Sequence, residues 1–88
     1  MRNKTIVTWG ELLLENLAET GDKLVYCTLS TEELNKEFDC GFGGSSGKEF
    51  TAWGERYVYF PVVYDGAEWI GKTPRNPCDE TTPHMGGE

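Results

Sequence analysis

The side chains best suited to metal or nucleophile chemistry in this sequence are three cysteines and one histidine: Cys27, Cys40, Cys78 and His84. Three thiolates and an imidazole make a chemically good zinc set. Structural zinc sites, however, usually begin with two cysteines roughly two to four residues apart, and that spacing does not occur here. An odd number of widely spaced cysteines also differs from the dense, even framework of small secreted proteins. The sequence therefore predicts three reduced thiols and no bound metal.

General acid–base or cysteine chemistry would depend on His84, which lies in a tail rich in proline and glycine. A catalytic base must be held in place by its neighbours, and such a tail offers little rigid support. The paired carboxylates of Glu32 and Glu33 stand at a predicted helix start, where acidic side chains are common because they interact favourably with the helix dipole. We expect no enzymatic activity and no cofactor.

The glycine-rich segment 41–47, followed by Lys48, invites comparison with a phosphate-binding loop. That loop requires a glycine five residues before its Gly-Lys pair and a serine or threonine after it. Phe42 and Glu49 occupy those two positions. We therefore interpret residues 41–47 as a flexible surface connector.

The first helix is marked by a capping box, because Thr8 is followed three residues later by Glu11. The pattern predicts a helix from about Trp9 to Thr20, with Gly21 as its C-terminal stop. Apolar residues at helical spacing form its predicted buried stripe: Trp9, Leu13, Leu14, Leu17 and Ala18.

A second capping box, Ser30 with Glu33, predicts a shorter helix over about residues 31–38. Residues 23–29, between the two helices, are rich in β-branched and aromatic side chains and are predicted to form a strand. Residues 5–7 are too short to assign.

The second half of the chain is predicted to be a β-hairpin. Residues 56–64 form one strand, Asp65-Gly66 favours a two-residue type I′ turn, and residues 67–73 return. This register sets Tyr64 opposite Ala67, Val62 opposite Trp69 and Phe60 opposite Gly71. Alternation gives one face Val58, Phe60, Val62 and Trp69, which we take as the core, and the other face Tyr57, Tyr59, Pro61, Val63 and Ile70.

A third strand is predicted around residues 49–53, with a turn at 53–56 leading into the hairpin. Pro61 restricts this pairing because it has no N–H to donate towards the third strand. A regular two-residue turn would require an N–H at Pro61. The pairing between the third strand and residues 56–64 therefore needs a bulge, a longer turn or an early end.

Together these elements predict an α+β fold, with two short N-terminal helices packed on an antiparallel sheet of three to four strands. Residues 1–75 would form this single domain, and residues 76–88, where prolines exclude regular structure, an irregular or mobile tail. No apolar run approaches the ~18 residues of a membrane span, and the basic N-terminus does not continue as a signal peptide. The expected location is the cytoplasm.

The net charge of −7 is unevenly distributed, because residues 11–40 hold eight acidic and two basic residues. A chain with this charge will not bind phosphate backbones, since that binding depends on clustered Lys and Arg. It favours a protein partner with a basic surface instead. The residues expected to attract that partner are Glu15, Glu19, Glu32, Glu33 and Glu37.

Aromatic residues are more numerous than a core of this size can hide, and Tyr and Trp are enriched at binding hot spots. If the second face of the sheet is open, we expect Tyr57, Tyr59 and Tyr64 to supply short-range affinity. A second interpretation stays open, in which the aromatic sheet face and the glycine-rich segment bind or sequester a small ligand.

The start Thr8-Trp9-Gly10-Glu11-Leu12-Leu13, the segment 59–69 and the sequence Pro74-Arg75-Asn76-Pro77 resemble in type the small acidic accessory proteins of bacteriophages and prophages. Anti-CRISPR proteins belong to this class. The resemblance implies a non-enzymatic inhibitor that blocks a host defence or nucleic-acid-handling protein in the host cytoplasm. It carries no functional residues over to this chain.

Overall fold

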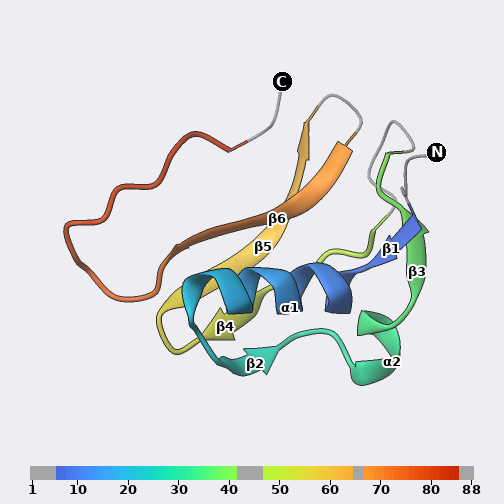
Figure 1. Cartoon of the computed structure of the whole chain (residues 1–88), viewed down its shortest axis with the longest axis horizontal. Coiled ribbons are helices and arrows are strands. Elements are labelled where there is room, and N and C mark those ends of the chain that lie inside the picture. The colour runs from blue at the N-terminus through green and yellow to red at the C-terminus, as the bar shows by residue number, and fades with distance from the viewer. Residues whose placement is uncertain (1–5, 42–46, 65–66, 86–88) are drawn as a thin grey trace.

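The computed structural model describes residues 6–41, 47–64 and 67–85 (Figure 1). It is an α+β fold with antiparallel strands, as predicted. One sheet has four strands in the order β2-β4-β5-β6, and a second pairs β1 with β3. The elements are β1 (Ile6–Thr8), α1 (Trp9–Thr20), β2 (Leu24–Cys27), α2 (Thr31–Leu34), β3 (Glu37–Asp39), β4 (Ala52–Gly54), β5 (Tyr57–Tyr64) and β6 (Ala67–Pro74).

Helix α1 has the predicted bounds because both of its ends are encoded locally. The Thr8 hydroxyl accepts a hydrogen bond from the Glu11 amide at 3.0 Å, and the Glu11 carboxylate accepts one from the Thr8 amide at 3.1 Å. Gly21 then ends the helix in the left-handed region with φ 67°, where a side chain would be strained. At 12 residues α1 is the longer described helix, and no described helix is long and apolar enough to span a bilayer.

The buried stripe of α1 is narrower than the sequence predicted. Trp9 and Leu13 are buried and Leu17 is half-buried, but Leu14 is 69% exposed and Ala18 is also exposed. Leu12, Leu13 and Leu14 are consecutive and together cover about 200° of the helix surface. Only the side of α1 that carries Trp9 and Leu13 packs against the core. The assignment of Leu14 and Ala18 to the buried stripe is therefore wrong.

Helix α2 is a single turn, which corrects the predicted helix over residues 31–38. Its capping box is present, since the Ser30 hydroxyl and the Glu33 carboxylate bond reciprocally to the two backbone amides. Beyond Asn35 the chain extends into β3, which pairs antiparallel with β1 and sets Val7 opposite Phe38. This pairing lies near the start of α1, where the Phe38 ring packs 4.6 Å from that of Trp9. The two-helix arrangement is therefore replaced by one full helix, one helical turn and a small ribbon.

The β5–β6 hairpin has the predicted register. Its pairs include Tyr64 with Ala67, Val62 with Trp69 and Phe60 with Gly71. The Asp65-Gly66 turn lies outside the described residues. β4 pairs Ala52 with Tyr59 and Trp53 with Val58, and its ladder ends before Pro61. An early end of this ladder, one of the three alternatives that Pro61 predicted, is therefore present.

The two faces of the hairpin are the reverse of the prediction. The face under α1 carries Tyr59, which is fully buried, and Ile70, which is 6% exposed. Trp69, predicted to lie in the core, is 37% exposed on the opposite face. Both faces are apolar, so alternation alone does not indicate which one a helix covers. The assignment of Val58, Phe60, Val62 and Trp69 to the core face is therefore wrong.

The tail packs against the hairpin without forming a helix or strand over residues 75–85. The Thr73 and Thr82 hydroxyls are 2.8 Å apart, and the Tyr57 hydroxyl donates to Glu80 at 2.9 Å. Met85 lies next to Gly71, on the face away from α1. Val62 is buried on that same face. The tail therefore shields part of the sheet that α1 leaves open.

The buried carboxylate of Asp22 joins α1, β2 and the β4–β5 turn. Its Oδ1 accepts hydrogen bonds from the amides of Lys23 at 2.8 Å and Arg56 at 3.0 Å. Its Oδ2 accepts from the Tyr57 amide at 3.1 Å and the Tyr59 hydroxyl at 2.9 Å. Gly54 makes room for this carboxylate, because a Cβ there would collide with it.

Burial by itself raises the pKa of the Asp22 carboxyl, but the four hydrogen bonds act in the opposite direction and outweigh it. The net pKa lies below the ordinary value of an aspartate. The folded structure therefore holds Asp22 ionised and stabilises that form.

We predict that Asp22→Asn lowers the free energy of unfolding at neutral pH by about 2–3 kcal/mol, because the amide turns an N–H group towards donors that need an acceptor. Urea unfolding of both proteins measures this difference. Asp79→Asn, at an exposed position in the tail, is the matched control and should change stability by less than about 0.5 kcal/mol.

The same pair of proteins should differ in acid sensitivity. Because the folded pKa of Asp22 is depressed, its stabilising contribution is complete above the unfolded pKa, about 3.9, and disappears as the pH falls through the folded pKa. The stability gap between wild type and Asp22→Asn should be constant near neutral pH and narrow below about pH 4. A gap that widens on acidification would contradict this assignment.

Candidate binding surfaces beside helix α2

The predicted acidic residues lie on α1, α2 and β3. Glu15 and Glu19 are exposed on α1, Glu32 is exposed on α2, and Glu37 is exposed on β3. Their exposure is compatible with long-range attraction of a basic partner. Their role in binding stays a prediction.

Glu33 differs from the other four acids because its carboxylate has a structural partner on each oxygen. Oε1 accepts the Ser30 amide at 2.9 Å, and Oε2 lies 3.7 Å from the Lys48 Nζ. The hydrogen bond from the Ser30 backbone is the main cause that holds the pKa of Glu33 below its usual value. Glu33 therefore caps α2 and pairs with Lys48.

Two of the three predicted tyrosine anchors, Tyr57 and Tyr59, do not form an open surface. Tyr59 is fully buried, with its hydroxyl donating to Asp22 and 3.1 Å from that of Thr20, and burial raises its pKa to about 12. The prediction that Tyr59 is an accessible anchor is wrong, because α1 covers its face of the sheet. Tyr57 is half-buried, and its hydrogen bond to Glu80 raises the pKa of its phenol. The Tyr64 side chain lies outside the described residues.

An aromatic surface does exist, on the face of the sheet away from α1 and with different members. Tyr26 is 62% exposed and its ring lies 5.8 Å from that of Trp53, its cross-strand partner. Trp69 is 37% exposed on the same face of the four-stranded sheet. The sequence predicted an open aromatic face but assigned Tyr57 and Tyr59 to it, because the face covered by α1 was misassigned.

Five leucines form an apolar hollow of about 210 Å³ between α1, β2 and α2, which we call the leucine groove. Leu14 and Leu24 are 69% and 41% exposed at this groove. The leucines are Leu13, Leu14, Leu17, Leu24 and Leu34. Sequence reasoning missed it, although three consecutive leucines on a surface helix already indicate that one cannot face the core.

Acidic side chains flank the leucine groove on both helices. On α1, the exposed Glu15 comes directly after the groove-lining Leu14 in the sequence and lies further from the core. On α2, the exposed Glu32 comes directly after Thr31, which also lines the groove. Two bases are also sequence neighbours of groove-lining residues, because Lys23 precedes Leu24 and Lys36 follows Asn35. An exposed apolar hollow with an acidic border is the surface expected for a partner that combines apolar and basic side chains.

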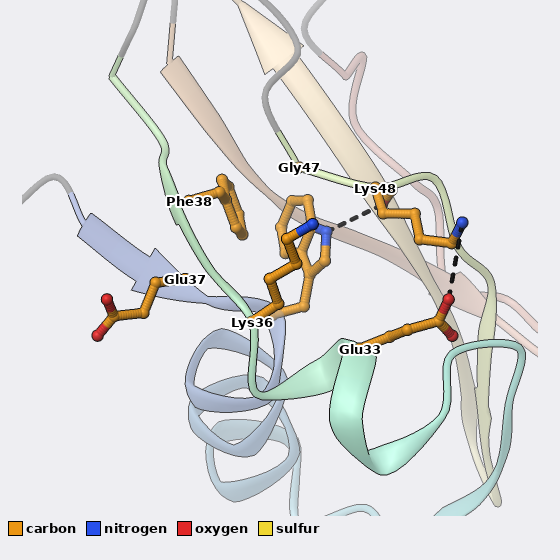
Figure 2. Close-up of a pocket in the computed structure, with 7 residues that line it drawn as sticks. Glu33, Lys36, Glu37, Phe38, Gly47 and Lys48 are labelled. Carbon is orange, nitrogen blue, oxygen red and sulfur yellow. Dashed lines mark hydrogen bonds and ion pairs between the residues drawn. The ribbon is translucent and has the colours of Figure 1, made fainter.

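A second hollow of about 370 Å³ lies on the other side of α2, and we call it the Trp9 cavity (Figure 2). The Trp9 indole N–H donates to the Lys48 carbonyl at 2.9 Å, which fixes the ring in place. Its lining residues are Trp9, Glu33, Lys36, Glu37, Phe38, Gly47 and Lys48.

Cys27 and Cys40 are half-buried and Cys78 is exposed, and all three are free thiols. Within residues 6–41, 47–64 and 67–85, no three His, Cys, Asp or Glu side chains are grouped so that they could hold a metal ion. Cys27 instead packs against the hydrophobic core.

Comparisons with protein-family models, with curated proteins and with solved structures each found no match. The geometry of the two hollows and the charge around them are therefore the basis for the functional proposals below.

We predict that Gly47→Ala destabilises the fold by about 1–3 kcal/mol, because a Cβ at this position would lie 2.5 Å from Cζ2 of the buried and hydrogen-bonded Trp9 ring. Thermal unfolding measures the loss, and tryptophan fluorescence reports a displaced indole. A variant with unchanged stability and emission would show that the Trp9 ring is not clamped by Gly47.

Proposed function

We propose that this protein is a non-enzymatic binding module whose leucine groove receives an amphipathic, basic segment of a partner protein. The observation that carries this proposal is the position of Leu14, a large apolar side chain 69% exposed beside the groove. Isolated exposed leucines are common, but an exposed leucine at a continuous apolar hollow has a free energy gain available on binding.

Charge complementarity favours a basic partner over a second copy of this chain. Each copy has a net charge of −7, and two acidic grooves facing each other would repel. The β2 edge is also a poor place for strand addition, since its pairing with β4 shifts register between Leu24 and Tyr26. Such irregularities on an edge strand discourage pairing with another chain.

The two groups of residues have separate tasks in this proposal. Glu15, Glu19, Glu32 and Glu37 attract the partner over long range and mainly raise the association rate. Leu14 and Leu24 provide the buried apolar contact, which mainly slows dissociation.

The particular form that we propose is a phage-encoded inhibitor of a basic host protein, acting in the host cytoplasm. Exposed carboxylates on α1, α2 and β3 can occupy a site that otherwise receives nucleic-acid phosphates. A defence or nucleic-acid-handling protein would present such a site.

Small-ligand binding is the second candidate function, and the Trp9 cavity favours it. Its volume falls in the range of about 300–1,000 Å³ that is typical of small-molecule sites. Its wall includes Gly47, at the end of the glycine-rich segment, but its aromatic side chains are Trp9 and Phe38 rather than those of the sheet.

We predict that a labelled amphipathic helical peptide of leucine and lysine binds the protein, and that a matched leucine–glutamate peptide does not. Leu14→Ala should weaken binding by about 1–2 kcal/mol through faster dissociation, without lowering the melting temperature, since this side chain is mostly exposed. Ile6→Ala, at a 45% exposed residue of β1, is the matched control and should leave binding unchanged. Equal losses of peptide affinity in the two variants would show that the peptide does not bind at the leucine groove.

Reversing the charge of the acidic residues separates their effect on the association rate from the effect of the leucines on the dissociation rate. The double variant Glu15→Lys with Glu32→Lys should slow association of the leucine–lysine peptide and flatten its dependence on salt concentration. Stopped-flow fluorescence at several salt concentrations measures both effects. The control, Glu49→Lys with Asp79→Lys, makes the same change in net charge at exposed positions outside the groove. If the control slows association as much, the attraction comes from net charge alone.

A further inference from the structure

The Trp9 cavity combines an aromatic wall with Lys36, a cation that forms no ion pair with the described residues. The rings of Trp9 and Phe38 meet at 4.6 Å with a tilt of 47°. Trp9 is 2% exposed and Phe38 is half-buried, so Phe38 offers the cavity more accessible aromatic surface. Such a wall is suited to a planar ring, because aromatic rings pack favourably against one another in edge-to-face or offset arrangements.

The four ionisable groups of the cavity do not cancel. Lys48 and Glu33 neutralise each other at 3.7 Å, as the dashed line in Figure 2 shows. Glu37 extends away from Phe38 and Lys48 in the same view. Lys36 extends into the space between Phe38 and Lys48, and among the described residues it forms no ion pair. Of the described lysines that line the cavity, Lys36 therefore presents a positive charge beside the aromatic wall that no described ion pair compensates.

From this arrangement we infer that the Trp9 cavity binds a small planar aromatic molecule carrying one negative charge, such as an aromatic carboxylate. The ring packs against Phe38 and Trp9, and the anionic group lies near Lys36. This inference rests on small-ligand binding, the second candidate function, and it names the ligand class. It does not depend on the leucine groove, which lies on the opposite side of α2.

The test uses three probes of nearly equal shape: 2-naphthoate, the neutral 2-naphthamide, and the cationic 2-naphthylmethylammonium. Each is titrated into ¹⁵N-labelled protein, and the indole N–H resonance of Trp9, assigned with Trp9→Phe, reports on the cavity. We expect 2-naphthoate to shift this resonance with saturation, and 2-naphthamide to bind at least about fivefold more weakly because it lacks the charge. The ammonium compound should bind most weakly.

Lys36→Gln should weaken 2-naphthoate binding about fivefold and leave 2-naphthamide binding unchanged. Lys23→Gln, at another exposed lysine that does not line the cavity, is the matched control and should have no effect. Unchanged melting temperatures in both variants establish that the fold is intact.

The possible failures are distinguishable. If the amide or the ammonium compound binds as well as 2-naphthoate, the anionic ligand class is wrong while small-ligand binding stands. If no probe shifts the Trp9 resonance, both the class and the second candidate function are overturned. If Lys23→Gln weakens binding as much as Lys36→Gln, the charge recognition does not occur in this cavity.

Discussion

The buried carboxylate of Asp22 is the constraint on which the rest of this structure depends. It follows the left-handed Gly21 that ends α1. Its four hydrogen bonds come from Lys23 just before β2, from the two amides at the start of β5 and from the hydroxyl of Tyr59. Those bonds place α1 over the Tyr59 face of the hairpin. An ionised group at this depth is tolerated because every bond it accepts is charge-assisted. The position of α1 in turn decides which surfaces remain open.

Once α1 covers the Tyr59 face, the binding features follow from what it leaves uncovered. The face of α1 that meets the core is too narrow to bury three consecutive leucines. Leu14 therefore faces outward and lines the leucine groove together with Leu24 and Leu34. The single turn of α2 then separates this groove from the Trp9 cavity, with Leu34 on one side and Glu33 on the other. One hollow is apolar with an acidic border. The other has an aromatic wall and Lys36, which forms no ion pair within the described residues, so the two hollows are suited to different ligands.

Much of the fold was predictable because its signals are local. The Thr8–Glu11 capping box and Gly21 predict α1 from one end to the other, and the hairpin register follows from two apolar strands around Asp65-Gly66. The β1–β3 ribbon was not predictable, since Val7 and Phe38 are far apart in the sequence and each strand is short. The face covered by α1 was misassigned for a related reason: Asp22 selects it through non-local bonds to residues 56–59. The exposed acidic residues could be predicted from composition. The leucine groove beside them could not, because it depends on which sheet face α1 covers.

The central claim is that a partner binds at the leucine groove, which stays exposed because Asp22 holds α1 over the Tyr59 face. Mapping the contact surface tests this claim most directly. ¹⁵N-labelled protein is titrated with the leucine–lysine peptide, and the perturbed amides and leucine methyl groups are located on the structure. The account predicts that the changes centre on Leu14, Leu24 and Leu34, with little change at the aromatic face away from α1. Changes centred on Tyr26, Trp53 and Trp69 would contradict it and move the binding surface to the opposite side of the sheet.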